Sequence, residues 1–306
     1  MADSNGGVAV IQTLRRFFEK RRLIVYIYDM HRFITTSSIR NVVTGGILLL
    51  SALTVNAQHA EPLRYTCYQT GKQINIDGKP DEAAWQQAPW TSDFTDIEGD
   101  KQPKPPLRTR VKMVWDQEYL YIAAEMEEPH VWGKLLKHDT IIFHDNDFEV
   151  FIDPDGDTKE YFEIEINARN TIFDLFMPRP YSEGGHALMT WDTKGMRTEV
   201  HINGTLNQPA DKDKSWTVEM AIPFKALHLL GVPMIPENGT TWRINFSRVE
   251  WDTEIKNGQY VKKLNPATGK PLPEHNWVWS PQGVINMHVP QKWGYLQFAT
   301  QTGNNQ

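Results

Sequence analysis

The sequence predicts an all-β protein, specifically a two-sheet antiparallel β-sandwich of the jelly-roll or immunoglobulin-like kind with short helical turns. Two observations lead to this prediction. Apolar and polar residues alternate with a period of two in many short stretches, and clusters of Pro, Gly, Asp and Asn separate these stretches. The chain shows no regular succession of strands and helices, so a parallel α/β sheet is not expected.

The clearest strands lie in residues 146–167, where two alternating stretches flank the segment Asp153-Pro154-Asp155-Gly156-Asp157. Pro fixes one backbone angle and Gly permits a positive one, so this segment is expected to turn the chain between two antiparallel strands. One face of the hairpin carries Phe, Val and Ile and must be covered by a core. The other face carries Glu and can meet water or a polar ligand.

The other elements follow in chain order. Residues 73–78 are expected to form a short strand, and Pro80 with the acidic residues after it begins a helical turn that ends near Trp85. Residues 110–126 form a second hairpin. Further strands are expected over residues 171–176, 197–202, 216–222, 242–247 and 293–298, with a short helix over residues 224–230.

Charge and aromatic residues are unevenly distributed along the chain. Residues 1–57 hold seven Lys/Arg and three Asp/Glu, which leaves 25 basic and 35 acidic side chains for residues 58–306. Such an acidic body argues against nucleic acid or an anionic membrane as the main partner. All eleven Trp lie beyond residue 57, so they require a sizeable core or contact surfaces. The one cysteine, Cys67, cannot form an intrachain disulfide.

The N-terminal region contains the only long apolar run, residues 42–55. A membrane span needs roughly 20 residues, which is longer than this run. Arginines precede it and Val55-Asn56-Ala57 follows as a small-x-small pattern, so residues 30–57 are expected to be a signal peptide cleaved near Ala57. Residues 1–29 are then an extension from a start codon assigned too early. The alternative is an uncleaved anchor.

These segments define the expected organisation. Residues 58–306 form a single mature domain, which is secreted or periplasmic and has no stable membrane span after cleavage.

Several short motifs occur in a characteristic order: Ile76-Asp77-Gly78, Asp81-Glu82-Ala83-Ala84-Trp85, Val114-Trp115-Asp116, Phe148 to Asp157, Trp216-Thr217-Val218-Glu219, and Asn245 to Arg248. This order resembles that of carbohydrate-binding module family 9-like domains, and Ser280 to His288 with Trp293-Gly294-Tyr295 resembles a bacterial secreted subgroup. The resemblance covers nearly all of residues 70–299. It implies a sandwich of two antiparallel sheets, sugar binding through aromatic side chains, and often bound calcium. Many members are modules of polysaccharide-degrading enzymes, whereas this sequence shows no catalytic domain.

Sugars bind proteins by stacking their C–H faces on aromatic rings and by pairing their hydroxyls with polar side chains. Tryptophans beside charged groups in the long irregular segments, residues 127–146 and 251–289, therefore indicate a sugar site. The predicted substrate-binding residues are Trp132, Arg248, Glu250, Trp251, Trp277 and Trp279. Arg248 resembles the family's arginine that hydrogen-bonds sugar hydroxyls. The alternatives are a structural ion pair and aromatic anchors for long loops.

The remaining tryptophans are interpreted from their positions. Trp191, beside Asp192, is a further candidate for sugar contact. Trp115, Trp216 and Trp242 alternate with polar strand positions and are expected in the core.

A group of aspartates predicts a structural calcium: Asp145, Asp147, Asp153, Asp155 and Asp157. Calcium takes roughly six to eight oxygen ligands, which Asp-rich turns supply. The spacing of the last three resembles the start of a calcium loop, although the far glutamate and the leading helix of an EF-hand are missing. Ordinary turn chemistry is the alternative. His138 and His144 do not match a zinc-binding spacing.

We interpret the chain as a secreted, non-catalytic protein of polysaccharide catabolism that binds a polysaccharide or oligosaccharide by aromatic stacking and Arg/Glu hydrogen bonds. One alternative is a glycoside hydrolase or another hydrolase that acts on glycosyl bonds. Glu163 and Glu165 share a strand face about 6.6 Å apart, within the range of glycosidase carboxylate pairs, but such neighbours are more often solvated. A second alternative is a haem- or cofactor-binding sandwich. No nucleophile elbow, phosphate loop or dinucleotide motif predicts a catalytic residue.

Overall fold

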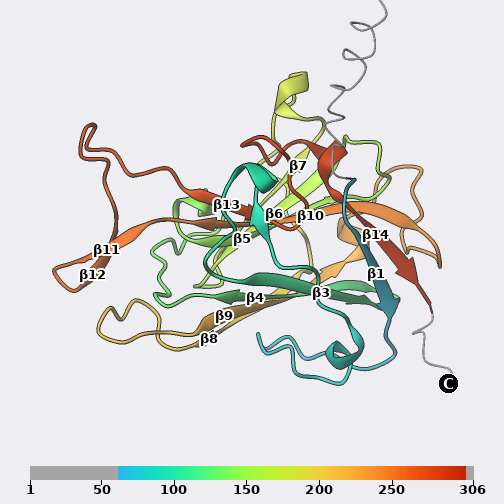
Figure 1. Ribbon diagram of the computed structural model, residues 1–306. Helices are drawn as coiled ribbons and strands as arrows, with labels where there is room; N and C mark the ends of the chain where they lie inside the picture. Colours follow the sequence, from blue (N-terminus) through green and yellow to red (C-terminus); the bar gives the residue numbers. More distant parts are fainter. Residues whose placement is uncertain (1–60, 301–306) are drawn as a thin grey trace, which may run out of the picture. The chain divides into compact units, whose positions relative to one another are not determined.

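Short strands make up most of the regular structure in the computed structural model, which describes residues 61–300 (Figure 1). Within these residues the helices are short 3-10 turns, and none is long and apolar enough to cross a membrane. The predicted start extension over residues 1–29 and the predicted signal peptide over residues 30–57 lie outside the described residues. Both therefore stay predictions.

Ten strands follow one another in a single hydrogen-bonded path, in the order β7-β6-β5-β10-β14-β1-β3-β4-β9-β8. The first layer contains β7 (Ile172–Met177), β6 (Tyr161–Asn167), β5 (Asp147–Asp153), β10 (Thr241–Glu250) and β14 (Gly294–Ala299). The second layer contains β3 (Thr109–Trp115), β4 (Tyr119–Glu127), β9 (Ser215–Pro223) and β8 (Arg197–Asn203). Between them, β1 (Arg64–Gln69) pairs in parallel with both β14 and β3. All other pairs along this path are antiparallel.

Side chains from both layers form one hydrophobic core. Phe148, Val150 and Ile152 of β5 are fully buried, as the alternation predicts, and belong to the same core as Trp216 and Val218 of β9. Burial of each such side chain contributes about 1.5–3 kcal/mol to stability. The predicted two-sheet sandwich is thus confirmed, and β1 is a parallel connection that the alternating pattern does not reveal.

The segment before β3 differs from its prediction. The expected strand over residues 73–78 is wrong, because this segment forms no strand and instead packs against the outer face of β9. The buried Glu219 carboxylate of β9 fixes it by accepting hydrogen bonds from the backbone N–H groups of Asp77 and Gly78 and from the Trp85 indole. The helical turn expected to begin at Pro80 and end near Trp85 instead begins at Trp85, as η2 (Trp85–Gln87).

The long segment after β10 contains strands as well as loops. β11 (Thr253–Lys256) and β12 (Gln259–Lys262) form a separate hairpin, which projects from the sandwich in Figure 1. β13 (His275–Val278) pairs with the end of β10 and with β2 (Thr95–Asp96). The other 3-10 helices are η3 (Gly99–Lys101), η4 (Ile142–His144), η5 (Tyr181–Glu183), η6 (Phe224–Ala226) and η7 (Pro290–Lys292).

Candidate functional site

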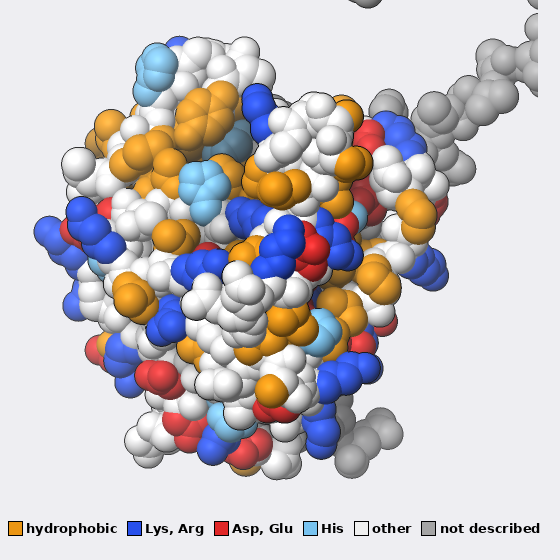
Figure 2. All heavy atoms as spheres, turned by 90° about the vertical axis from the view of Figure 1, so that its left-hand side faces the viewer, with side chains coloured by type: hydrophobic (Ala, Val, Ile, Leu, Met, Phe, Trp, Pro, Cys, Tyr) orange, Lys and Arg blue, Asp and Glu red, His pale blue; other side chains and the backbone are white. Residues whose placement is uncertain are grey.

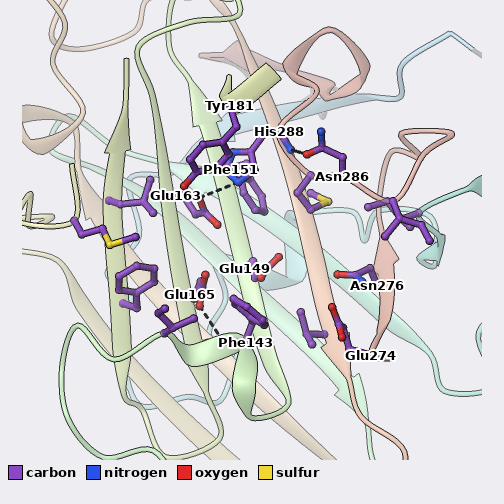
Figure 3. Close-up of a pocket in the computed structure, with 18 residues that line it drawn as sticks. Phe143, Glu149, Phe151, Glu163, Glu165, Tyr181, Glu274, Asn276, Asn286 and His288 are labelled. Carbon is purple, nitrogen blue, oxygen red and sulfur yellow. Dashed lines mark hydrogen bonds and ion pairs between the residues drawn. The ribbon is translucent and has the colours of Figure 1, made fainter. Parts of the chain in front are cut away.

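A cleft of about 360 Å³ lies on the outer face of the first layer, and we call it the glutamate cleft. Its floor comes from residues of β5 and β6 whose side chains point away from the core, because neighbours along a strand alternate between the two faces. Glu149 lies opposite Glu165, and Phe151 lies opposite Glu163. Figure 3 shows these side chains side by side across the two strands.

Loops from distant parts of the sequence form the walls of the glutamate cleft. Tyr181 and His288 lie together at one end, and Phe143 lies near Glu165 at the other (Figure 3). Exposed apolar side chains also contribute to the lining: Ile141, Met189 and Ile285. Figure 2 shows hydrophobic and histidine side chains on one face of the molecule. The cleft therefore combines an acidic floor with a partly apolar wall.

The acidic floor is little exposed to solvent. Glu163 and Glu165 are 5% and 3% exposed, so the expectation that they form a solvated face is wrong. Loop segments cover them, and the backbone N–H groups of Ile142 and Phe143 each donate to Glu165 at 3.0 Å. Burial raises the pKa of Glu163 and Glu165 well above the usual range, and it raises the pKa of Glu149 to about 7. Among the described residues, no Lys or Arg lines the cleft.

A histidine and a tyrosine form the polar end of the cleft, and the buried Tyr161 contacts the histidine. The Nδ1 atom of His288 lies 2.8 Å from the Tyr161 hydroxyl, and its Nε2 lies 3.8 Å from a Glu163 carboxylate oxygen. Burial lowers the pKa of His288 to about 4, so its ring is neutral at neutral pH. The Tyr181 ring packs edge-on against His288 and is 46% exposed. Tyr181 therefore offers an aromatic surface to a ligand in the cleft.

Arg248 does not lie on the rim of the sandwich. It follows Ile244 and Phe246 on the inward face of β10 and is fully buried. Its guanidinium donates to Glu128 and Glu250 at 2.8 Å, and also to the Thr109 hydroxyl and the Glu127 carbonyl of the second layer. The expectation of an accessible sugar-binding arginine is thus wrong, and the alternative of a structural ion pair describes these contacts.

The four loop tryptophans predicted as sugar contacts are also buried. Trp132, Trp251, Trp277 and Trp279 are only 2–9% exposed. Trp132 and Trp251 pack with Val249 in a small cluster, whereas Trp277 and Trp279 belong to the main core. Since long loops need apolar anchors, the expected exposure of these indoles is wrong. Whether any of them contacts a ligand stays a prediction.

Two of the six predicted binding residues border a second hollow. Glu250 and Trp277 line this space of about 310 Å³ together with His275. Trp191 is half-buried, packs against Phe162, and lines a further hollow of about 600 Å³ with Asp192 and Lys194.

The three remaining tryptophans agree with their predictions. Trp115, Trp216 and Trp242 are buried in the core, as expected.

The predicted calcium residues fall into separate groups. Asp147 and Asp153 occupy opposite ends of the seven-residue strand β5, so one ion cannot bind all five aspartates. Asp145 accepts hydrogen bonds from the backbone of Lys134 and Leu135 and from the Asn167 amide, all to one oxygen. It therefore organises the loop before β5.

The aspartates at the end of β5 lie close together. One oxygen from each of Asp153, Asp155 and Asp157 lies within 4.8 Å of the others. Both oxygens of Asp153 accept backbone N–H groups of the turn, from Gly156 and Thr158. Turn chemistry thus accounts for Asp153, and calcium at this end of the strand stays a prediction.

Comparisons with known proteins agree with this architecture. The family model described as "Carbohydrate family 9 binding domain-like" matches residues 76–269. A protein from Bacteroides uniformis ATCC 8492, described as a candidate for carbohydrate binding, is 16% identical, with a TM-score of 0.55 and coverage of 77% of this chain and 99% of that chain. A carbohydrate binding module family 9 from Caldicellulosiruptor kristjanssonii in complex with cellotriose is 16% identical, with a TM-score of 0.49 and coverage of 79% and 97%. No curated protein matches the chain.

Proposed function

Because the chain belongs to the carbohydrate family 9 binding domain-like family, we propose that it binds carbohydrate, and that the sugar occupies the glutamate cleft. The observation that carries this assignment is the pairing of an exposed aromatic ring with oxygen acceptors in one hollow. Tyr181 offers its ring at one end, and the floor offers the carboxyl groups of Glu149 and Glu163. Stacking and hydrogen bonding to hydroxyls are the two contacts that sugars require.

The size and polar lining of the cleft support the proposal. A volume of about 360 Å³ falls within the range of small-ligand sites in proteins. Asn276 and Asn286 face the carboxyl groups from the other side of the cleft (Figure 3). Amides donate as well as accept, so a sugar hydroxyl could be paired on both sides.

The second hollow is an alternative position for the same function. It contains Glu250 and Trp277, which the sequence predicts as sugar contacts. Trp277 is 4% exposed, so its ring leaves little surface for a sugar to stack on. We therefore place the sugar in the glutamate cleft.

Glycoside hydrolysis is a second candidate function, because Glu149, Glu163 and Glu165 all line one cleft. A glycosidase needs one protonated and one ionised carboxyl group, and burial raises the pKa of these groups in the direction required of a general acid. Release of reducing sugar by the wild-type protein, and its loss in Glu163→Gln, would favour this function over binding alone. The cofactor-binding alternative predicts a coloured purified protein.

A glycan array probed with the purified protein tests the proposed function. We expect binding to a restricted set of polysaccharide-derived oligosaccharides, and calorimetric titration with the best ligand should give a saturable curve without loss of intact glycan. Failure to bind any glycan, or turnover of the bound glycans, would contradict non-catalytic carbohydrate binding.

We also propose that the protein is exported, because residues 30–57 have the layout of a signal peptide. N-terminal sequencing of protein recovered from the periplasm or the medium should read from Gln58, directly after the small-x-small pattern. A recovered chain that begins before residue 50 would show that this region is retained and would contradict the proposal.

A further inference from the structure

Three carboxyl groups converge on the outer face of β5 and β6. Asp147 and Glu149 lie two residues apart on β5, and Glu165 of β6 lies directly opposite Glu149. One oxygen from each of these three side chains lies within 4.8 Å of the others. Asp147 is completely buried, and the other two are nearly so. We call this group the carboxylate trio.

Two members of the carboxylate trio, Asp147 and Glu149, lack partners that buried carboxyl groups normally have, whereas Glu165 accepts hydrogen bonds from the backbone of Ile142 and Phe143. Among the described residues, three oxygen atoms of the trio are buried without a hydrogen-bond partner: Oδ1 and Oδ2 of Asp147 and Oε2 of Glu149. No ion pair between described residues includes a member of the trio. Buried polar atoms are rarely left in this state, so a missing partner is indicated.

A neutral side chain, that of Ser247, lies on the same face of the sheet as the trio and also has a buried oxygen that makes no ordinary hydrogen bond. Ser247 of β10 lies directly opposite Glu149, and side chains of directly opposed residues point to the same face of a sheet. Its hydroxyl is fully buried and makes no hydrogen bond of ordinary geometry in the described part of the chain, although it lies close enough to Glu149 to lower the pKa of that carboxyl group. A serine does not repel carboxylates, so acidity alone does not explain its presence. Its hydroxyl adds a further oxygen donor at the position of Glu149.

Lys262 is the competing cation that the fold supplies. Its charge interacts with Asp147 through space, but its ammonium lies 3.1 Å from the centre of the Trp251 ring, and no described ion pair joins it to Asp147. The three carboxyl groups of the trio therefore lie close together and out of contact with water, and no ion pair among the described residues offsets their mutual repulsion or the cost of removing them from water.

We propose that Asp147, Glu149, Glu165 and Ser247 bind one divalent cation, and that this cation is calcium. All donors in the set are oxygens, which hard cations prefer, and three carboxylates with a hydroxyl suit the high oxygen count of calcium better than the strict octahedron of magnesium. Glu149 and Glu165 line the glutamate cleft, so the cleft gives an ion a path to the trio. The site differs from the group at Asp153, Asp155 and Asp157. It does not depend on the proposed carbohydrate binding.

Calorimetric titration of the purified chain with CaCl2, after treatment with EDTA and buffer exchange, tests the site directly. We expect the wild type to bind calcium, and Asp147→Asn and Glu165→Gln each to weaken the affinity at least about tenfold, because each removes a charged ligand. MgCl2 should bind more weakly. No sugar is present, so a negative result would leave the carbohydrate proposal standing.

Thermal melting supplies a second readout that separates a binding role from a merely structural one. In EDTA, Asp147→Asn should melt above the wild type, because it removes a carboxyl group that is buried at a desolvation cost and without a hydrogen-bond partner. In CaCl2 the order should reverse, because only the wild type gains the full stabilisation by a bound ion. The same order in both buffers would overturn the proposal.

The other acidic group provides the decisive comparison. The double variant Asp155→Asn with Asp157→Asn should keep the calcium-dependent rise in melting temperature. If this variant loses the rise while Asp147→Asn retains it, the ion binds at the turn after β5 and the proposal is wrong. Absence of any calcium effect in the wild type would also overturn it.

Discussion

Arg248→Met should lower the free energy of unfolding by about 3–5 kcal/mol, as expected when one partner of a buried ion pair is removed. Arg248 is enclosed between the two layers and donates to both Glu128 and Glu250. Methionine can fill part of the space but leaves the two glutamates without their cation. Urea denaturation followed by tryptophan fluorescence measures the loss.

Arg108 is a matched control, because its guanidinium also bridges two glutamates, Glu125 and Glu127. Its side chain is 40% exposed, whereas that of Arg248 is 1% exposed. Since solvent screens exposed ion pairs, Arg108→Met should cost no more than about 1 kcal/mol. Equal losses for the two variants would show that burial does not set the contribution of Arg248.

The misassignment of Arg248 shows what the sequence could have revealed. Ile244 and Phe246 of the same strand are core residues, so the period of two already places the side chain of Arg248 on the inward face. Its main partner, Glu128, comes from a segment 120 residues away in the sequence. An isolated sequence does not reveal such a pairing, and a buried arginine is easily mistaken for an exposed one.

The sandwich was predictable because alternation is a local signal, and the β5–β6 hairpin has the expected faces. The position of β1 could not be predicted in this way, because one of its neighbours, β14, comes from the end of the chain and the other, β3, from a later segment. The same limit applies to the cleft. The sequence shows that Glu163 and Glu165 share a face, but the loops that cover them come from residues 141–143 and 284–288.

Tyr181→Ala should weaken glycan binding at least about tenfold, which corresponds to about 1.4 kcal/mol. The Tyr181 ring is the largest exposed aromatic surface in the glutamate cleft, and its loss removes the platform on which a sugar can stack. Because 46% of the side chain is exposed, folding should be little affected. Calorimetric titration with the best ligand from the glycan array measures the change.

The comparison with Tyr181→Phe identifies the contact. Phenylalanine keeps the ring and removes only the hydroxyl, so binding within about threefold of the wild type is expected if stacking dominates. Tyr119→Ala is the matched control, since Tyr119 lies on β4 in the other layer. If Tyr181→Ala binds as tightly as the wild type while Glu250→Gln weakens binding, the sugar occupies the second hollow, and the acidic floor of the glutamate cleft serves the cation alone.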